Sequence, residues 1–177
     1  KSKIRIKVLK NRKAKASMCL SIDFKKIMKI LKKNGSSNKV IGGYYPYNYE
    51  IDTTKILEKL EKLKYKISLP KIRKKSQMNF FNWSTADPLT INKFGIPEPN
   101  SNKIVYPSVL LVPIVAYDKH YNRIGYGGGF YDRYISRIRK TKKILTIGLA
   151  YSFQKVRKVP NNNNDIRLDF IVTDKTK

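Results

Sequence analysis

The eleven residues from Arg123 to Arg133, RIGYGGGFYDR, decide how this chain is expected to fold. Four of the nine glycines lie between positions 125 and 129, after an apolar run at 109–115 and before an amphipathic segment at 130–140. Glycines reach positive φ without strain and let backbone N–H groups approach an anion. A following helix adds unpaired N–H groups and a partial positive charge. The order strand, glycine turn and helix therefore predicts an α/β unit whose turn can wrap a phosphate.

The glycine spacing matches neither of the common phosphate-binding motifs. Phe130 stands where a dinucleotide fingerprint needs glycine, and no Gly-Lys-Ser/Thr follows as in a P-loop. A tight turn without any ligand remains an alternative on the glycines alone. Asp132 and the flanking Arg123 and Arg133 favour a nucleotide site, because a carboxylate can bind Mg²⁺ and guanidinium groups pair with phosphate.

At this point the sequence resembles a known family. GYGGGFYDR, at 125–133, and LVPIVAYD, at 111–118, resemble the signature of the 5-formyltetrahydrofolate cyclo-ligases, also called 5,10-methenyltetrahydrofolate synthetases. The resemblance extends from Lys1 to Thr173. It implies an ATP-dependent ligase that uses Mg²⁺ to convert 5-formyltetrahydrofolate to 5,10-methenyltetrahydrofolate, with release of ADP and phosphate. Reduced folate and ATP are then the expected small-molecule partners.

The resemblance also implies which residues form each part of the site. The ATP-binding residues are Lys1, Arg5, Arg123, Ile124, Gly125, Tyr126, Gly127, Gly128, Gly129, Phe130 and Tyr131. The substrate-binding residues are Tyr45, Glu50, Phe94, Tyr126, Gly127, Gly128, Gly129 and Phe130. The Mg²⁺ ligands are Asp132 and Asp165, with Asp169 as a nearby support. No residue stands out as a general base, so catalysis is expected to be electrostatic.

Several of these residues have a plainer interpretation without the resemblance. Glu50 precedes a predicted helix, where the macrodipole favours an acid, and Asp165 follows four asparagines, as a turn former would. Phe94 is equally compatible with an aromatic that anchors its loop to the core. Lys1 and Arg5 suit a solvated helix face. The chain also departs from the family by carrying Asn164 where a histidine is usual.

The charge is the most prominent bulk property, with 39 Lys and Arg against 12 Asp and Glu and a net charge of +27. Such a surface attracts nucleic acid, because each neutralised phosphate releases counterions. The cations are spread along the whole chain, as in a lysine-rich proteome, so we expect no specific nucleic-acid partner. A basic nucleic-acid-binding module and a non-catalytic folate- or nucleotide-binding relative remain the alternative functions.

Length and composition indicate one domain spanning 1–177. The absence of an eighteen-residue apolar run argues against a membrane partner. Cys19 is the sole cysteine, so no intramolecular disulfide can form, and a cytoplasmic monomer is the expectation. His120 lies in a turn composition and is expected to be solvated, not catalytic.

The periodicity predicts a three-layer α/β/α sandwich around a mostly parallel sheet. Pro70 is expected to close one strand, and Pro113 to mark a bulge or a strand end. The long proline-rich segment at 85–107 is expected to be a connection. Helices are predicted at 1–16, 23–33, 53–64 and 130–140, and strands at 40–45, 66–69, 77–83, 109–115, 143–150 and 170–173.

Overall fold

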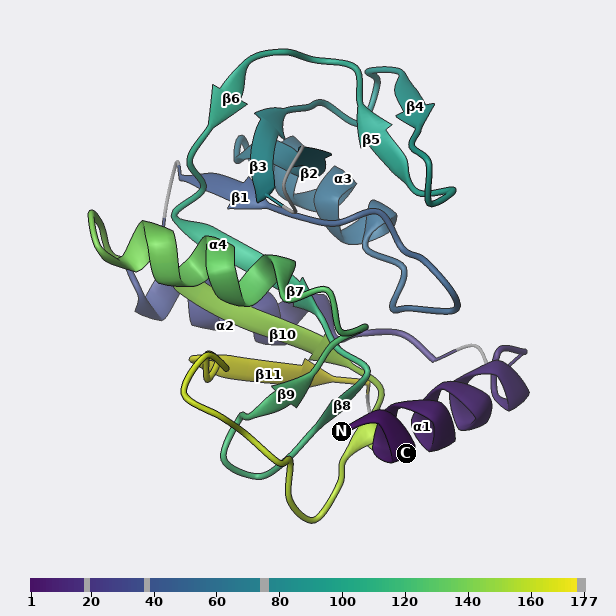
Figure 1. The fold of residues 1–177 in the computed structure, drawn as a ribbon. Helices are drawn as coiled ribbons and strands as arrows, with labels where there is room; N and C mark the ends of the chain where they lie inside the picture. Colours follow the sequence, from purple (N-terminus) through teal and green to yellow (C-terminus); the bar gives the residue numbers. More distant parts are fainter. Residues whose placement is uncertain (18–19, 37–38, 74–76, 175–177) are drawn as a thin grey trace.

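A computed structural model of the chain describes residues 1–17, 20–36, 39–73 and 77–174. Cys19 lies outside the described residues. A seven-stranded sheet forms the centre, in the order β11-β10-β7-β1-β2-β3-β6 (Figure 1). Its strands are β1 (Val40–Gly42), β2 (Lys66–Arg73), β3 (Gln77–Asn82), β6 (Ile104–Val105), β7 (Val109–Pro113), β10 (Leu145–Ala150) and β11 (Phe170–Thr173).

Two small antiparallel ribbons stand outside this sheet, and both carry parts of the site. One is β4 (Leu89–Ile91) with β5 (Pro97–Pro99), and the other is β8 (Ala116–Tyr117) with β9 (Arg123–Ile124). The helices are α1 (Ser2–Ala14), α2 (Phe24–Lys33), α3 (Thr54–Lys62) and α4 (Phe130–Arg139). No helix among the described residues is long and apolar enough to cross a bilayer.

Helices cover both faces of the sheet, which confirms the three-layer sandwich. Strands β11, β10, β7, β1 and β2 run parallel, while β3 and β6 are antiparallel to their neighbours. Along β7, Val109 and Leu111 pack with α2 and α3, whereas Leu110 and Val112 pack with α4. Figure 1 shows α4 in front of β7 and β10, with α2 behind. A strand apolar on both faces is what a central parallel strand requires.

Helix α1 belongs to neither of the two helix layers that cover the sheet and packs instead against the β8–β9 ribbon. Val8 is buried there with Val115, Ala116 and Ile124, and Ile4 and Leu9 flank it. Ile4, Val8 and Leu9 therefore form a narrow apolar stripe on α1. Because β9 leads directly into the glycine turn, this packing brings the first turns of α1 to the site.

The expectation that Pro70 ends β2 is wrong, because the strand continues to Arg73 and pairs with β3 throughout. Beyond Ser68, β2 has lost its other neighbour, β1. The Ile72 N–H points away from β3 and donates to Glu98 Oε1 at 2.8 Å. Because the two sides of a strand alternate with a period of two residues, the Pro70 nitrogen lies on the same side as the Ile72 N–H. Pro70 therefore costs no ladder hydrogen bond. Pro113 does end β7, as expected.

Candidate active site

All the ATP-binding, substrate-binding and metal-binding residues expected from the sequence line one cavity of about 1010 Å³, and only the supporting Asp169 lies outside it. Its walls come from α1, the segment after β1, the β4–β5 ribbon, β9 with the glycine turn, the start of α4 and the 162–166 loop. Pro113, at the carboxyl end of β7, also lines it. Open α/β sheets bind ligands beyond the carboxyl ends of their strands, so the cavity has the position expected of an active site.

The glycine turn uses two glycines for conformations that other residues adopt only with strain. Gly127 has φ +107°, and Gly129 has φ +65° as the N-cap of α4. Arg5 lies against this turn and donates from Nε to the Gly125 carbonyl at 2.8 Å. A Cβ on Gly127 would stand 3.2 Å from an Arg5 guanidinium nitrogen. The turn and the α1 cation therefore form one surface of the cavity.

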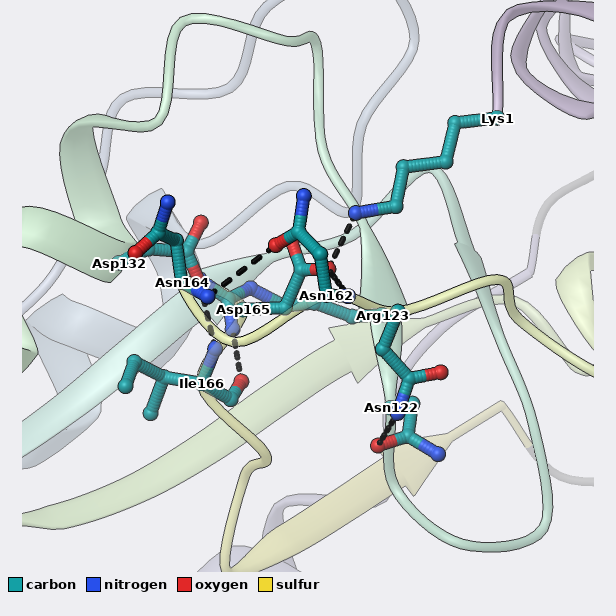
Figure 2. A network of polar contacts seen from close by, with 9 residues as sticks. Lys1, Asn122, Arg123, Asp132, Asn162, Asn164, Asp165 and Ile166 are labelled. Atoms are coloured by element: carbon teal, nitrogen blue, oxygen red, sulfur yellow. Dashed lines mark hydrogen bonds and ion pairs between the residues drawn. The ribbon is translucent and has the colours of Figure 1, made fainter.

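The two predicted metal ligands are each held by a cation and a backbone N–H group (Figure 2). Asp132 Oδ1, in the first turn of α4, accepts from Arg123 Nη2 and from the Ile166 N–H, both at 2.9 Å. Asp165 accepts from the Lys1 ammonium and from the Asn162 N–H, the latter at 2.7 Å. These bonds fix both carboxylates from elements far apart in the sequence.

Burial and local contacts shift the pKa values of Asp165 and Arg123 in this part of the cavity. Partial burial acts to raise the pKa of Asp165, but the hydrogen bonds from Lys1 and Asn162 outweigh it, so its pKa lies below the usual value. Burial lowers the pKa of Arg123, and the Asp132 carboxylate opposes that effect. Arg123 also donates to the Ile166 carbonyl, so its guanidinium is committed to holding Asp132 and the 162–166 loop.

The donor set fits Mg²⁺ bound together with a phosphate ligand. Mg²⁺ prefers oxygen, and in nucleotide sites it is held by one or two carboxylates plus phosphate oxygens and water. Asp132 and Asp165 supply two carboxylates at the cavity wall. No group of three or more His, Cys, Asp or Glu side chains gathers among the described residues, so a cage built only of protein ligands is not available there.

Glu50 is a largely buried carboxyl in the wall of the same cavity. It is 9% exposed and accepts from the Tyr47 N–H through Oε2 at 3.0 Å. Burial raises its pKa to about 7, against the lowering effects of that hydrogen bond and of the Arg12 charge. The Tyr131 hydroxyl is buried nearby without a hydrogen-bond partner among the described residues. An unsatisfied buried donor on a cavity wall suits a ligand acceptor.

Two aromatic residues complete the predicted folate-binding part. Phe94 sits at the turn of the β4–β5 ribbon and is 49% exposed, so the alternative that it anchors the loop in the core is wrong. Tyr45 is half-buried just after β1 and faces the same cavity. His120 is exposed in its turn, as expected.

The structure corrects one sequence-based role and adds one residue. Asp169 accepts from Thr146 and Arg139 near the amino ends of β10 and β11 and does not line the cavity. It therefore does not support the metal ligands.

The added residue is Arg12, which the sequence did not single out. It is buried beside Tyr126, on the same face of α1 as Lys1 and Arg5, since eleven residues make about three helical turns. That spacing was the available signal.

Comparison with known proteins agrees with this geometry. Residues 1–174 match the model of the 5-formyltetrahydrofolate cyclo-ligase family. The 5-formyltetrahydrofolate cyclo-ligase of Haemophilus influenzae is 34% identical over 137 residues, 73% of each chain. That of Escherichia coli K12 is 33% identical over 137 residues, 73% of this chain and 75% of its own.

Two solved structures share the fold. A 5,10-methenyltetrahydrofolate synthetase from Aquifex aeolicus has a TM-score of 0.74 and 30% identity, covering 97% of this chain and 88% of its own. A 5,10-methenyltetrahydrofolate synthetase from Mycoplasma pneumoniae has a TM-score of 0.74 and 24% identity, and the match covers 97% of this chain and 96% of that one. The chain therefore belongs to the 5-formyltetrahydrofolate cyclo-ligase family of ligase enzymes.

Proposed function

We propose that this protein catalyses the ATP-dependent conversion of 5-formyltetrahydrofolate to 5,10-methenyltetrahydrofolate, with release of ADP and phosphate. The observation that carries the proposal is a cavity lined by a cationic glycine turn, by two carboxylates and by the buried Glu50. Family membership supplies the reaction class, and this arrangement suits a nucleotide and a ring with N–H donors bound side by side.

The reaction needs positioning more than a protein nucleophile. The N5-formyl oxygen attacks the γ-phosphorus, an O–P bond forms and ADP leaves. N10 then attacks the formyl carbon, the C–O bond breaks and phosphate leaves, while N10 loses its proton to solvent. Holding the formyl oxygen in line with the γ-phosphate accounts for much of the rate in such a step.

The phosphate end is proposed to use charges already gathered there. Arg5 and the backbone N–H groups of the glycine turn would bind phosphate oxygens, and Lys1 would move from Asp165 to the phosphates. Asp132 and Asp165 would hold Mg²⁺, which neutralises charge on the phosphates when bound. Arg123 would keep Asp132 aimed at the cavity.

The folate end is proposed to recognise the pterin by hydrogen bonds and stacking. The Glu50 carboxylate would accept N–H groups of the ring, and the unpartnered Tyr131 hydroxyl would donate to an acceptor on the folate. Tyr45 and Phe94 would form the aromatic walls against which the flat rings pack.

The direct test follows the ultraviolet absorbance of the methenyl product, with 5-formyltetrahydrofolate and Mg²⁺ present and ATP added or omitted. A rise that depends on ATP is the expected result. A folded protein that binds ATP but gives no product would instead be the non-catalytic relative. Failure to bind ATP, with RNA binding that persists at physiological salt, would support the nucleic-acid alternative.

Replacing Gly127 by alanine tests the phosphate end separately. At φ +107° an alanine is strained by about 1–3 kcal/mol, and its Cβ would push against the Arg5 guanidinium. We expect the KM for ATP to rise about tenfold while the KM for the folate changes less than about twofold. The matched control is Gly125→Ala, whose Cβ would meet nothing within 4 Å. Equal effects of the two substitutions would contradict this role for the turn.

A further inference from the structure

Arg12 is a buried cation that forms no ion pair with any described residue. Its side chain is 2% exposed, and its guanidinium donates to the Tyr126 hydroxyl and, at 3.4 Å, to the Ile114 carbonyl. Its Nε has no hydrogen-bond partner, and no ion pair that the structure shows among the described residues includes it. A buried charge is expensive unless something nearby makes use of it.

A series of hydrogen bonds leads from Arg12 to the cavity. The Tyr126 hydroxyl, which accepts from Arg12, lies 3.4 Å from the Tyr47 carbonyl, to which it donates. The Tyr47 N–H in turn donates to Glu50 Oε2 at 3.0 Å. The rings of Tyr47 and Tyr126 also meet edge to face, with centroids 5.9 Å apart. Helix α1 is thereby connected, through the glycine turn, to the carboxylate at the folate end.

The segment that carries Glu50 needs such support. Asn48 and Tyr49 have φ values of +49° and +59°, so two consecutive non-glycine residues adopt the left-handed conformation. Each such residue costs of order 1 kcal/mol and persists only where its surroundings fix it. Tyr47 and Tyr49 are 42% and 49% exposed, so burial of their side chains contributes little to holding this turn.

The groups that act on Glu50 include one permanent charge. Tyr44, Tyr126, Tyr131 and Tyr151 are near enough to interact with it, and all are neutral around pH 7, since the ordinary tyrosine pKa is 10.0 and burial raises the pKa of each. Arg12 is the cation acting on Glu50, and its charge lowers the pKa of that carboxyl. Burial raises the pKa of Glu50, whereas the Tyr47 N–H and then the Arg12 charge lower it, so both favour the ionised carboxylate.

We propose that Arg12 is a positioning residue for the folate: through Tyr126 it holds the 47–50 turn so that Glu50 faces the cavity, and its positive charge favours the Glu50 carboxylate that accepts ring N–H groups. This inference rests on the proposed function, because it takes the ligand of Glu50 to be a reduced folate. It assigns to α1 a role at the folate end, in addition to the phosphate contacts of Lys1 and Arg5.

The test measures direct binding of 5-formyltetrahydrofolate by calorimetry, without ATP, at pH 7 and pH 9. Arg12→Met keeps an unbranched apolar stem and removes the charge. We expect it to weaken folate binding at least about tenfold at pH 7, and to recover several-fold at pH 9, where Glu50 ionises without help. The Kd for Mg-ATP should change less than about twofold. Lys13→Met, an exposed cation of the same helix, should leave both affinities unchanged.

Two further variants separate the two parts of the role. Arg12→Lys keeps the charge but not the planar fork, so it should restore part of the folate affinity at pH 7. Tyr126→Phe removes the hydroxyl between Arg12 and Tyr47 while leaving the charge in place. It should weaken folate binding to a similar extent at pH 7 and pH 9. If Arg12→Met does not fold, as judged by circular dichroism, these two variants carry the test.

Specific results would overturn the inference. A wild-type protein that binds folate, with an Arg12→Met variant equally impaired at both pH values and for Mg-ATP, would reduce Arg12 to a packing residue. Wild-type affinity in both Arg12→Lys and Tyr126→Phe would do the same. A wild-type protein that binds no folate at either pH would overturn the proposed function first, and the inference with it.

Discussion

Asp132→Asn should lower the rate of methenyl product formation by about 10²- to 10³-fold while the protein stays folded. The amide is close in shape to the carboxylate, and its oxygen can still accept from Arg123 and from the Ile166 N–H. What it loses is the negative charge that would hold Mg²⁺ against the phosphates. The measurement is initial rate at saturating ATP and folate, with thermal unfolding followed in parallel.

Asp169→Asn is the matched control for this substitution. Asp169 also accepts from an arginine and from a backbone N–H group, those of Arg139 and Thr146, but it lies at the other end of the sheet. It should therefore leave the rate within about twofold, whatever it does to stability. Near-normal turnover in Asp132→Asn, or an equal loss in Asp169→Asn, would refute the metal assignment.

Glu50→Gln should abolish tight folate binding and yet stabilise the protein above pH 7. The pKa of Glu50 is raised from 4.5 to about 7 in the folded state. Between these values the folded protein binds more protons than the unfolded chain, so Glu50 makes stability fall as pH rises through this window. Above pH 7 the cost of burying the ionised carboxylate is about 3 kcal/mol, and the neutral amide avoids it.

Thermal unfolding across pH measures this effect. At pH 8 the variant should melt roughly 4–10 °C above the wild type, and the difference should vanish below pH 4.5. Glu58→Gln provides the contrast, because Glu58 is exposed on α3 and Lys62 lowers its pKa, so its removal should not stabilise at any pH. A Glu50→Gln variant that is no more stable than wild type at pH 8 would contradict the buried, charged state of Glu50.

The sequence predicted the parts of this site that are local along the chain. The glycine turn, its preceding strand and the start of α4 follow one another, so their geometry comes from short-range preferences, and Asp132 is placed with them. The layers of the sandwich followed from strands apolar on both faces. Glu50 and Asp165 came from the family resemblance, because on their own they read as a helix-start acid and a turn former.

Features that depend on distant neighbours were not predicted. The helical spacing places Arg12 on the face of Lys1 and Arg5, but among 39 Lys and Arg it does not show that Tyr126 covers this one. Pro70 was expected to end its strand because proline disrupts a strand with neighbours on both sides. The strand tolerates it because β1 no longer pairs with β2 beyond Ser68, which the local sequence does not show. Asp169 has the spacing from Asp165 that the family resemblance requires. The chain enters β11 directly after it, however, and the Asp169 carboxylate accepts from Thr146.

The contact between Lys1 and Asp165 joins positions 164 apart and has a consequence for how the protein is made. During synthesis this part of the cavity cannot form until residues 1 to 165 have all left the ribosome. A nucleotide that binds there would therefore not act as a template for the first strands. It would favour the finished fold by mass action, after the sheet has assembled on its own apolar contacts.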